Sequence, residues 1–272
     1  MKKNKYINRK INDIGIAEIL INDPVNKNAV NFQMNQEIID TLLEYDKDPK
    51  VRVIILSAVE DIFCGGGNIK KMVQEGKALE PEKPIIINNL PEHVSDIRAV
   101  TYLMRNIQKP IIGAINGPAV GSGVGLAAAC DIRITNDKAK FAWVFAKRGI
   151  LPDDGSLKLI LDILGYAKTF QWAMTASTLL ANEAKDLGFV NEVTTENNLM
   201  KRCYEIAQLI ATNVPPMTAN NLKQSILHAN ENSLSASMGY IYELQKINRE
   251  TQDAQEALAA YKEKRKPRWL GK

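Results

Sequence analysis

The chain is poor in the residues that build disulfide frameworks and histidine-based metal sites. It has three cysteines and two histidines among 272 residues. Cys64, Cys130 and Cys203 are odd in number and widely spaced, and no CxxC pair occurs, which argues against a disulfide framework and against structural zinc. Because His93 and His228 lie far apart in the sequence, we expect no metal site.

Long apolar runs and a strong charge of one sign are also missing. No apolar stretch is long enough to span a bilayer, and the basic residues 1–5 precede no apolar segment of a secretory signal. The formal net charge of +4 is small for this length. It favours phosphate-bearing ligands but argues against nucleic-acid binding. We therefore expect a cytoplasmic protein with neither a membrane nor a nucleic-acid partner.

Apolar runs alternate with helical periodicities through the first half of the chain. The runs at 14–21, 51–57 and 110–115 indicate buried strands, and the apolar positions within 32–45 have helical spacing. This strand–helix–strand order is typical of an α/β fold. Beyond Gly155 a short strand is predicted at 189–193, and helices are predicted at 157–164, 199–211, 217–229, 235–249 and 253–264.

Two glycine-rich turns follow two of these predicted strands. The first is residues 63–68, FCGGGN, and the second is residues 116–125, NGPAVGSGVG. Glycine lets the backbone approach a ligand closely, and the start of a helix adds a partial positive charge. Two such turns facing one pocket would hold a developing oxyanion between two backbone N–H donors. The pattern favours chemistry on an activated carbonyl group.

Other glycine-loop chemistries fit the second turn poorly. Residues 121–126 depart from a dinucleotide-binding motif, because Leu126 stands where the motif has its third glycine. The motif also needs an acid about 20 residues later, and this chain has Lys147 in that region. The turn does not match the G-x-S-x-G motif of a serine nucleophile either, because Val120 stands at the first glycine position before Ser122. No histidine lies near Ser122 in the sequence. A Walker A loop is absent as well.

The same segments resemble motifs of the crotonase (enoyl-CoA hydratase/isomerase) superfamily. Residues 63–72, FCGGGNIKKM, resemble its F-x-x-G-x-D-(I/L)-K-x-M turn, with Asn68 in place of the aspartate. Residues 116–123 and 130–133 resemble its N-G-x-A-x-G-G-G and C-D-(I/L) block. The likeness continues through 139–141, 148–155, 184–190 and 264–267, and so covers nearly the whole chain in order.

The resemblance implies a fold and an assembly. The fold is an α/β crotonase (ClpP-like) fold of repeated ββα units, with a helical C-terminal trimerisation region. We accordingly predict an α/β core over residues 1–195 that holds the site, and a helical subdomain over 196–272. The implied assembly is a homotrimer, or a hexamer made of two trimers.

An acyl-CoA thioester is the substrate that the resemblance implies, with no permanently bound cofactor. Its carbonyl oxygen would lie between the amides of Gly67 and Ser122. Serine at 122 replaces the family's usual glycine, which adds a Cβ and leaves the amide. Lys266 would reach the ligand of a neighbouring subunit. The remaining implied contacts with coenzyme A are Lys27, Ala29, Asn68, Ile69 and Lys70.

The acids decide which reaction is expected. Hydratases of this superfamily use two glutamates, and the matching positions here are Gly125 and Phe145, so water addition by that route lacks both groups. Asp153 matches the aspartate of the isomerase branch, which includes dienoyl-CoA isomerase and the phenylacetate-pathway ring isomerase. A competing interpretation makes the segment 153–154 a helix cap, for which Asp154 is better placed.

We therefore predict an enoyl-CoA isomerase in which Asp153, held in an apolar pocket, moves a proton along a thioester enolate. A hydratase or acyl-CoA hydrolase that uses Asp153 to activate water, and a non-catalytic CoA-binding scaffold, remain as alternatives. The predicted lid is 76–91. The predicted pocket residues, which core packing would explain equally well, are Met72, Gly125, Trp143 and Phe145.

Overall fold

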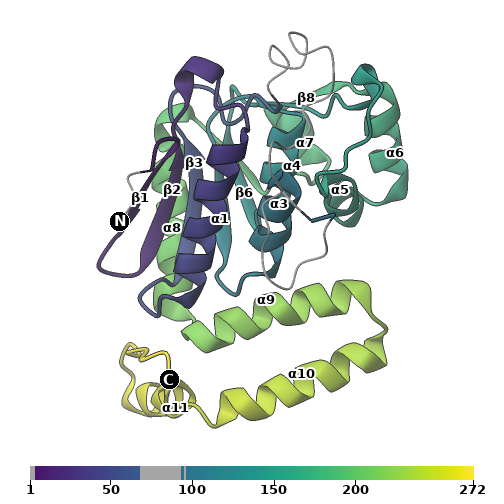
Figure 1. The fold of residues 1–272 in the computed structure, drawn as a ribbon. Coiled ribbons are helices and arrows are strands. Elements are labelled where there is room, and N and C mark those ends of the chain that lie inside the picture. The colour runs from purple at the N-terminus through teal and green to yellow at the C-terminus, as the bar shows by residue number, and fades with distance from the viewer. Residues whose placement is uncertain (1–3, 68–92, 95) are drawn as a thin grey trace.

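A computed structural model describes residues 4–67, 93–94 and 96–272 (Figure 1). Within them, a six-stranded sheet has the order β1-β2-β3-β4-β6-β9. The first strand is antiparallel to the second, and all later neighbours in this sheet are parallel. The strands are β1 (Ile7–Ile11), β2 (Ile16–Ile21), β3 (Val53–Ala58), β4 (Ile111–Ile115), β6 (Ile132–Asn136) and β9 (Glu192–Thr194).

A second, three-stranded sheet has the order β5-β7-β8. Its strands are β5 (Ala119–Val120), β7 (Lys140–Ala142) and β8 (Thr178–Leu180). β5 belongs to the second glycine-rich turn, and the amide of Gly121, the residue after it, donates to the carbonyl of Ala142 at 2.9 Å. The small sheet therefore fixes the position of the turn.

Helices cover both faces of the large sheet, as Figure 1 shows. On one face lie α1 (Phe32–Lys47), α3 (Asp96–Asn106) and α4 (Ser122–Ala129), and on the other lies α8 (Leu199–Asn213). The two-residue side-chain period of a strand explains the division. In β2, Ala17 and Ile19 pack in the cluster with α1, whereas Ile16 packs in the cluster with α8.

The remaining helices follow the core in sequence. The α-helices are α5 (Ser156–Leu164), α6 (Tyr166–Thr175), α7 (Ala181–Asp186), α9 (Pro216–Glu231), α10 (Leu234–Arg249) and α11 (Gln252–Glu263). Three short 3-10 helices are η1 (Pro24–Asn26), η2 (Ala146–Arg148) and η3 (Glu196–Asn198). In Figure 1, α9, α10 and α11 lie beyond one end of the sheet.

Two predicted boundaries differ from the structure. α8 falls in the predicted helical subdomain, yet its Leu199, Cys203 and Ala207 are buried against the large sheet, so α8 belongs to the α/β core. The strand predicted at 189–193 pairs only from Glu192, because the amides of Phe189 and Val190 donate to the carbonyl of Ala184 at 2.8 and 3.2 Å. Hydrogen bonds to α7 therefore replace strand pairing there.

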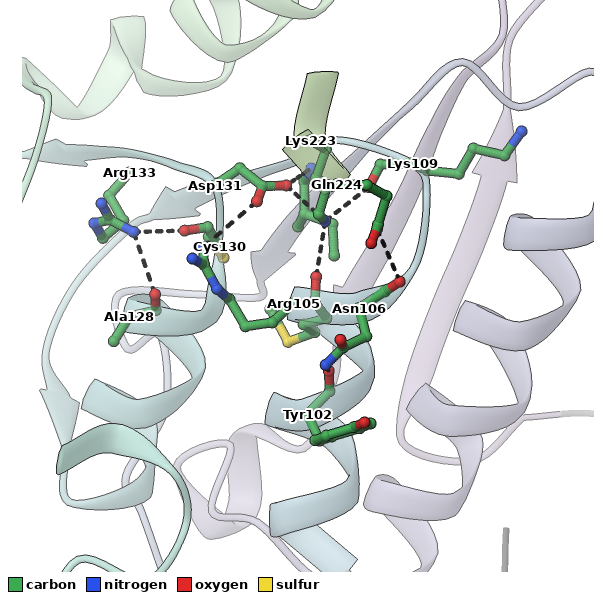
Figure 2. Close-up of polar contacts among 12 residues, drawn as sticks. Tyr102, Arg105, Asn106, Lys109, Ala128, Cys130, Asp131, Arg133, Lys223 and Gln224 are labelled. Carbon is green, nitrogen blue, oxygen red and sulfur yellow. Dashed lines mark hydrogen bonds and ion pairs between the residues drawn. The ribbon is translucent and has the colours of Figure 1, made fainter. Parts of the chain in front are cut away.

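A buried ion pair attaches α9 to the core (Figure 2). Lys223 is 7% exposed, and its Nζ lies 2.9 Å from Asp131 Oδ2. The same Nζ donates to the carbonyls of Met104 and Lys109 at 2.9 and 3.1 Å. Burial lowers the pKa of Lys223, and the charge of Asp131 opposes that shift. The helical extension is thus fixed to the core by a desolvated lysine.

Candidate active site

The two glycine-rich turns lie side by side. Cys64 pairs with Ala119 in an isolated parallel bridge, and the amide of Val120 donates to the carbonyl of Cys64 at 2.9 Å. Gly66 has a φ of +80°, and a Cβ at this position would overlap the carbonyl oxygen of Val120. Glycine is therefore required at 66 both for its backbone conformation and for the close approach. The two turns are therefore in contact, and that they face one pocket stays a prediction.

Gly67 and Ser122 each leave an amide without an acceptor among the described residues. Ser122 is the first residue of α4, and the first amides of any helix have no partner within it. The backbone of Gly121 before it is left-handed, with φ +52°. A Cβ built on Gly67 meets nothing within 4 Å. Both residues therefore lie on adjoining turns, and no described residue accepts a hydrogen bond from either amide; that the two amides hold a thioester oxygen stays a prediction.

Gly66→Ala is expected to destabilise the fold more than Gly188→Ala. Both glycines have left-handed φ values, +80° and +87°, but a Cβ at 188 meets nothing within 4 Å. The left-handed backbone costs each variant about 1–2 kcal/mol, and only the first also pushes the turns apart at Val120. Urea unfolding of both variants measures the difference. Equal losses would contradict the close contact between the turns.

The segment at Lys27–Val30 borders the first turn. The amide of Gly65 donates to the carbonyl of Lys27 at 2.9 Å, and the amide of Val30 donates to the carbonyl of Gly66 at 2.9 Å. Lys27 is exposed and Ala29 is buried. These two predicted contacts of coenzyme A therefore lie next to the turn that carries Gly67.

Asn28, between the two predicted contacts, has a structural role that its sequence position did not predict. It is buried with a φ of +52°. Its Oδ1 accepts from the amide of Asp23 at 2.8 Å, and its Nδ2 donates to the carbonyl of Ile62 at 2.8 Å. Asn28 therefore holds the Lys27–Val30 segment against the chain leading into the first turn. The signal available in the sequence was an asparagine, which tolerates the left-handed conformation better than most residues.

The remaining predicted contacts of coenzyme A lie outside the described residues or, in the case of Lys266, away from the glycine turns. Asn68, Ile69, Lys70 and Met72, and the predicted lid at 76–91, lie outside the described residues. Lys266 is exposed at the opposite end of the sheet, where the carbonyl of Trp269 accepts from Arg52 Nη2 at 3.2 Å. Within one chain, Lys266 is therefore not brought together with the glycine turns. A surface cavity of 890 Å³ at this distant end is lined by Arg52 and Trp269 among others.

Asp153 is exposed and faces a cation. Its side chain is 67% exposed, and its Oδ2 lies 2.9 Å from Nη1 of Arg98 on α3. The expected apolar pocket around this carboxylate is wrong, because solvent and a guanidinium surround it. Asp153 is not a cap either, because Gly155 is the N-cap residue of α5 and provides no side-chain bond. Its carboxylate is thus accessible to a ligand.

Asp154 has the opposite environment. It is 1% exposed, and its Oδ1 accepts from the amide and the hydroxyl of Ser156 at 3.1 and 2.5 Å. Its Oδ2 has no hydrogen-bond partner among the described residues. A Cβ at Gly125 would lie 2.6 Å from that oxygen, so the glycine on α4 leaves room for the carboxyl group. Burial raises the pKa of Asp154, the two hydrogen bonds from Ser156 oppose that rise, and the charge of Asp153 adds to it.

Trp143 belongs to the core, and Phe145 to its margin. Trp143 is 2% exposed, its ring centroid lies 5.6 Å from that of Trp172, and its Nε1 donates to Ser156 Oγ at 2.9 Å. The structure thus places this tryptophan behind the loop of Asp153 and Asp154, not on an open surface. Phe145 is half-buried, packs against the core and precedes η2.

The three cysteines are free and buried. In the described part of the chain, no three or more side chains of His, Cys, Asp or Glu are grouped so as to hold a metal ion. Nor is any helix there long and apolar enough to cross a membrane.

Comparison with known proteins identifies the family. The family described as enoyl-CoA hydratase/isomerase matches residues 12–272. The peroxisomal Delta(3,5)-Delta(2,4)-dienoyl-CoA isomerase of Arabidopsis thaliana is 30% identical over 98% of this chain and 97% of its own length. The chain belongs to the enoyl-CoA hydratase/isomerase family. Its fold is the crotonase fold, and its members process acyl-CoA thioesters.

Similarity to other members shows that the family carries several chemistries. The 4-chlorobenzoyl coenzyme A dehalogenase-2 of an Arthrobacter species is 32% identical over 77% of this chain and 75% of its own length. A solved enoyl-CoA hydratase from Bacillus anthracis superposes with a TM-score of 0.89 at 25% identity, covering 98% of this chain and all of that one. Membership therefore establishes an acyl-CoA enzyme of this family, and the reaction must be argued from the site.

Proposed function

We propose that the protein is an enoyl-CoA isomerase that moves a carbon–carbon double bond through a thioester enolate. The observation that carries the proposal is the exposed carboxylate of Asp153, in the loop that packs on α4. The positions of the two hydratase glutamates are occupied by Gly125 and Phe145, which do not ionise. One acid–base group is what a proton shift needs, whereas water addition by the two-glutamate route needs two.

The proposed chemistry uses the glycine turns and Asp153 in sequence. The amides of Gly67 and Ser122 would donate to the thioester oxygen, and removing one such donor typically costs about 2.7–4 kcal/mol of transition-state stabilisation. Asp153 would take a proton from C2 of a 3-enoyl-CoA, so that the electrons of the C–H bond form an enolate. Return of the proton to C4 moves the double bond from C3–C4 to C2–C3, with no atom gained or lost.

Arg98 would orient the base. Its guanidinium lies 2.9 Å from Asp153 Oδ2, on the side of the loop that faces α3. Holding one carboxylate oxygen in an ion pair leaves the other oxygen for the substrate. A positioned base of this kind shortens the search for a reactive geometry.

Water activation by Asp153 is the second candidate function. The exposure of its carboxylate, 67%, favours this alternative, because a water molecule can reach the same oxygen that would take the proton. Addition of that water to C3 would make the protein a hydratase, and attack on the thioester carbon would make it a hydrolase. A non-catalytic CoA-binding scaffold would not need an exposed acid at this position.

Product analysis with panels of 3-enoyl-CoA and 2-enoyl-CoA thioesters separates these functions. The proposal predicts conversion of a 3-enoyl-CoA to a 2-enoyl-CoA of unchanged mass. A product heavier by one water would identify a hydratase, and free coenzyme A would identify a hydrolase. If the protein binds coenzyme A esters in calorimetry and converts none of the panel, the catalytic proposal is wrong.

We also propose that the protein forms a homotrimer, alone or paired as a hexamer. Support comes from a row of exposed apolar side chains on α9 and α10: Leu222, Ile226, Leu234, Met238 and Tyr242. Exposed apolar side chains that recur every four residues along two helices favour a protein interface there. Light scattering is expected to give three or six times the chain mass of 30.3 kDa. The variants Ile226→Glu and Met238→Glu should lower that mass, whereas a wild-type monomer would contradict the proposal.

A further inference from the structure

Asp154 is a buried acid that the proposed reaction does not use. The side chain is 1% exposed, and Oδ2 has no partner among the described residues. Aspartate is rarely buried this completely unless it is paired, because transferring its charge out of water is costly. No cation pairs with its carboxyl group in the described part of the chain. Buried acids often lie at functional sites, so Asp154, which is adjacent to the proposed base, is a candidate functional residue.

The backbone and side chain of Asp154 join several elements. Its carbonyl accepts from Thr101 Oγ1 of α3 at 2.6 Å. Its Oδ1 accepts from both the amide and the hydroxyl of Ser156, the first residue of α5. The Ser156 hydroxyl in turn accepts from Trp143 Nε1, just after β7. The residue before it, Asp153, is thereby held by a loop anchored on both sides.

The fourth element is α4, which carries the proposed oxyanion donor. The 2.6 Å separation between Oδ2 and a Cβ built on Gly125 places the carboxyl group directly against the first turn of this helix. That turn begins at Ser122. Asp154 therefore lies between the residue that would take the proton and the helix whose first amide would hold the thioester oxygen.

We propose that Asp154 is a positioning residue of this site: its buried carboxyl group, bonded to Ser156 and packed against Gly125, holds residues 153–156 on α4, so that Asp153 keeps its place relative to the Ser122 amide. The inference rests on the proposed function. Burial also favours the protonated form of Asp154, and that form places no second negative charge beside Asp153.

Few ionisable groups surround Asp154 among the residues that the structure describes. Asp153 belongs to its own loop, and Arg98 of α3 pairs with Asp153. Cys64 faces it from the first glycine turn, where burial raises the pKa of the thiol to about 11, so that this group is neutral as well. Ser156 and Trp143 do not ionise in the accessible range. Ionised Asp154 would therefore face another carboxylate and a neutral thiol.

A stability experiment tests the neutral state without any assay of activity. The folded-state pKa of Asp154 is raised above the unfolded value of 3.8, so the protonated form stabilises the fold below that pH. This contribution is lost as the pH rises through the folded pKa. The amide side chain of the variant Asp154→Asn cannot ionise, so the Tm of the variant minus that of wild type should increase progressively from pH 4 upward. The exposed Asp13→Asn variant is the control and should show no such trend. A constant Tm difference across pH 4–9 would overturn the neutral state.

The contact with Gly125 is tested by a double-mutant cycle. Gly125→Ala adds a Cβ that meets Oδ2 of Asp154 and should lower the Tm in the wild-type background. In an Asp154→Ala background the obstacle is gone, so the same substitution should lower the Tm by much less. Equal losses in the two backgrounds would show that the carboxyl group is not locked against α4.

Kinetics then separate positioning from simple packing. Asp154→Ala should lower kcat for isomerisation by about 100-fold in folded protein with a nearly unchanged KM, because misplacing a reacting group by about 1 Å costs this much. Asp154→Asn keeps the shape and the Ser156 bonds and should recover most of that loss. If both folded variants match wild type, or if asparagine is as damaging as alanine, the positioning role is wrong. If wild type itself isomerises nothing, the proposed function fails, and the Tm experiments still decide whether Asp154 is neutral and locked.

Discussion

Replacing Asp153 by asparagine is expected to lower kcat for double-bond isomerisation by at least about 100-fold, because a positioned acid–base group typically contributes 10²–10⁴-fold. Asparagine has nearly the same shape and accepts no proton in this range. The side chain is 67% exposed, so the substitution should leave the fold intact. Steady-state kinetics with a 3-enoyl-CoA measure the loss, and thermal unfolding together with binding of coenzyme A esters confirm that the site is otherwise preserved.

The matched control for this prediction is Asp13→Asn, which removes an exposed aspartate from the turn between β1 and β2. It should keep wild-type kcat. A folded Asp153→Asn variant that also turns over at the wild-type rate would show that another group moves the proton. Arg98→Met is expected to fall between these two, because it removes the ion pair and keeps the carboxylate.

Lys223→Met is expected to cost about 3 kcal/mol or more of unfolding free energy. Removing one partner of a buried ion pair typically costs about 3–5 kcal/mol, because the other charge stays desolvated and unpaired. Here Asp131 loses the ammonium at 2.9 Å, and the carbonyls of Met104 and Lys109 lose a donor. The lower end of the range is expected, because Asp131 is 21% exposed and keeps two partners in the variant. Its Oδ2 still accepts from the amide of Ile111 at 2.8 Å, and its Oδ1 lies 3.6 Å from Arg105 Nη1.

Lys158→Met is the surface control for this measurement. Lys158 and Asp162 form an ion pair within α5, with the lysine side chain 56% exposed. Helical pairs of this spacing contribute about 0.2–0.5 kcal/mol. Urea unfolding should therefore separate the two variants clearly. Similar losses would mean that α9 is not fixed to the core through Lys223.

The sequence predicted the large elements because their apolar periodicity is strong. The helix expected at 32–45 is α1, and the strand expected at 51–57 overlaps β3. The small sheet was missed, because β5 has two residues and its pairing with β7 depends on where the second glycine turn lies. β1 was missed as well, since its sequence INRKI has one buried residue, Ile7, and no alternation to detect.

At the site, backbone-based features were easier to predict than side-chain directions. The glycine turns were found because glycine itself signals a close approach, as at Gly66 against Val120. The sequence could not predict that Asp153 is exposed and Asp154 is buried, because their burial depends on Thr101 and Gly125, which are far away in the sequence. For the same reason, the sequence around Trp143 did not show whether this side chain belongs to the core or to the wall of a pocket.

The most direct test of the proposed enolate is deuterium exchange during turnover. A 3-enoyl-CoA is incubated with the protein in heavy water, and the position of deuterium in the product is read by NMR. Because the carboxyl group of Asp153 is 67% exposed, it can exchange the proton with solvent before returning it, so the proposed mechanism predicts a 2-enoyl-CoA that carries deuterium at C4 with wild type. It predicts neither conversion nor exchange with Asp153→Asn. A product with a hydroxyl group at C3, or unchanged conversion by the folded variant, would contradict an isomerase that works through Asp153.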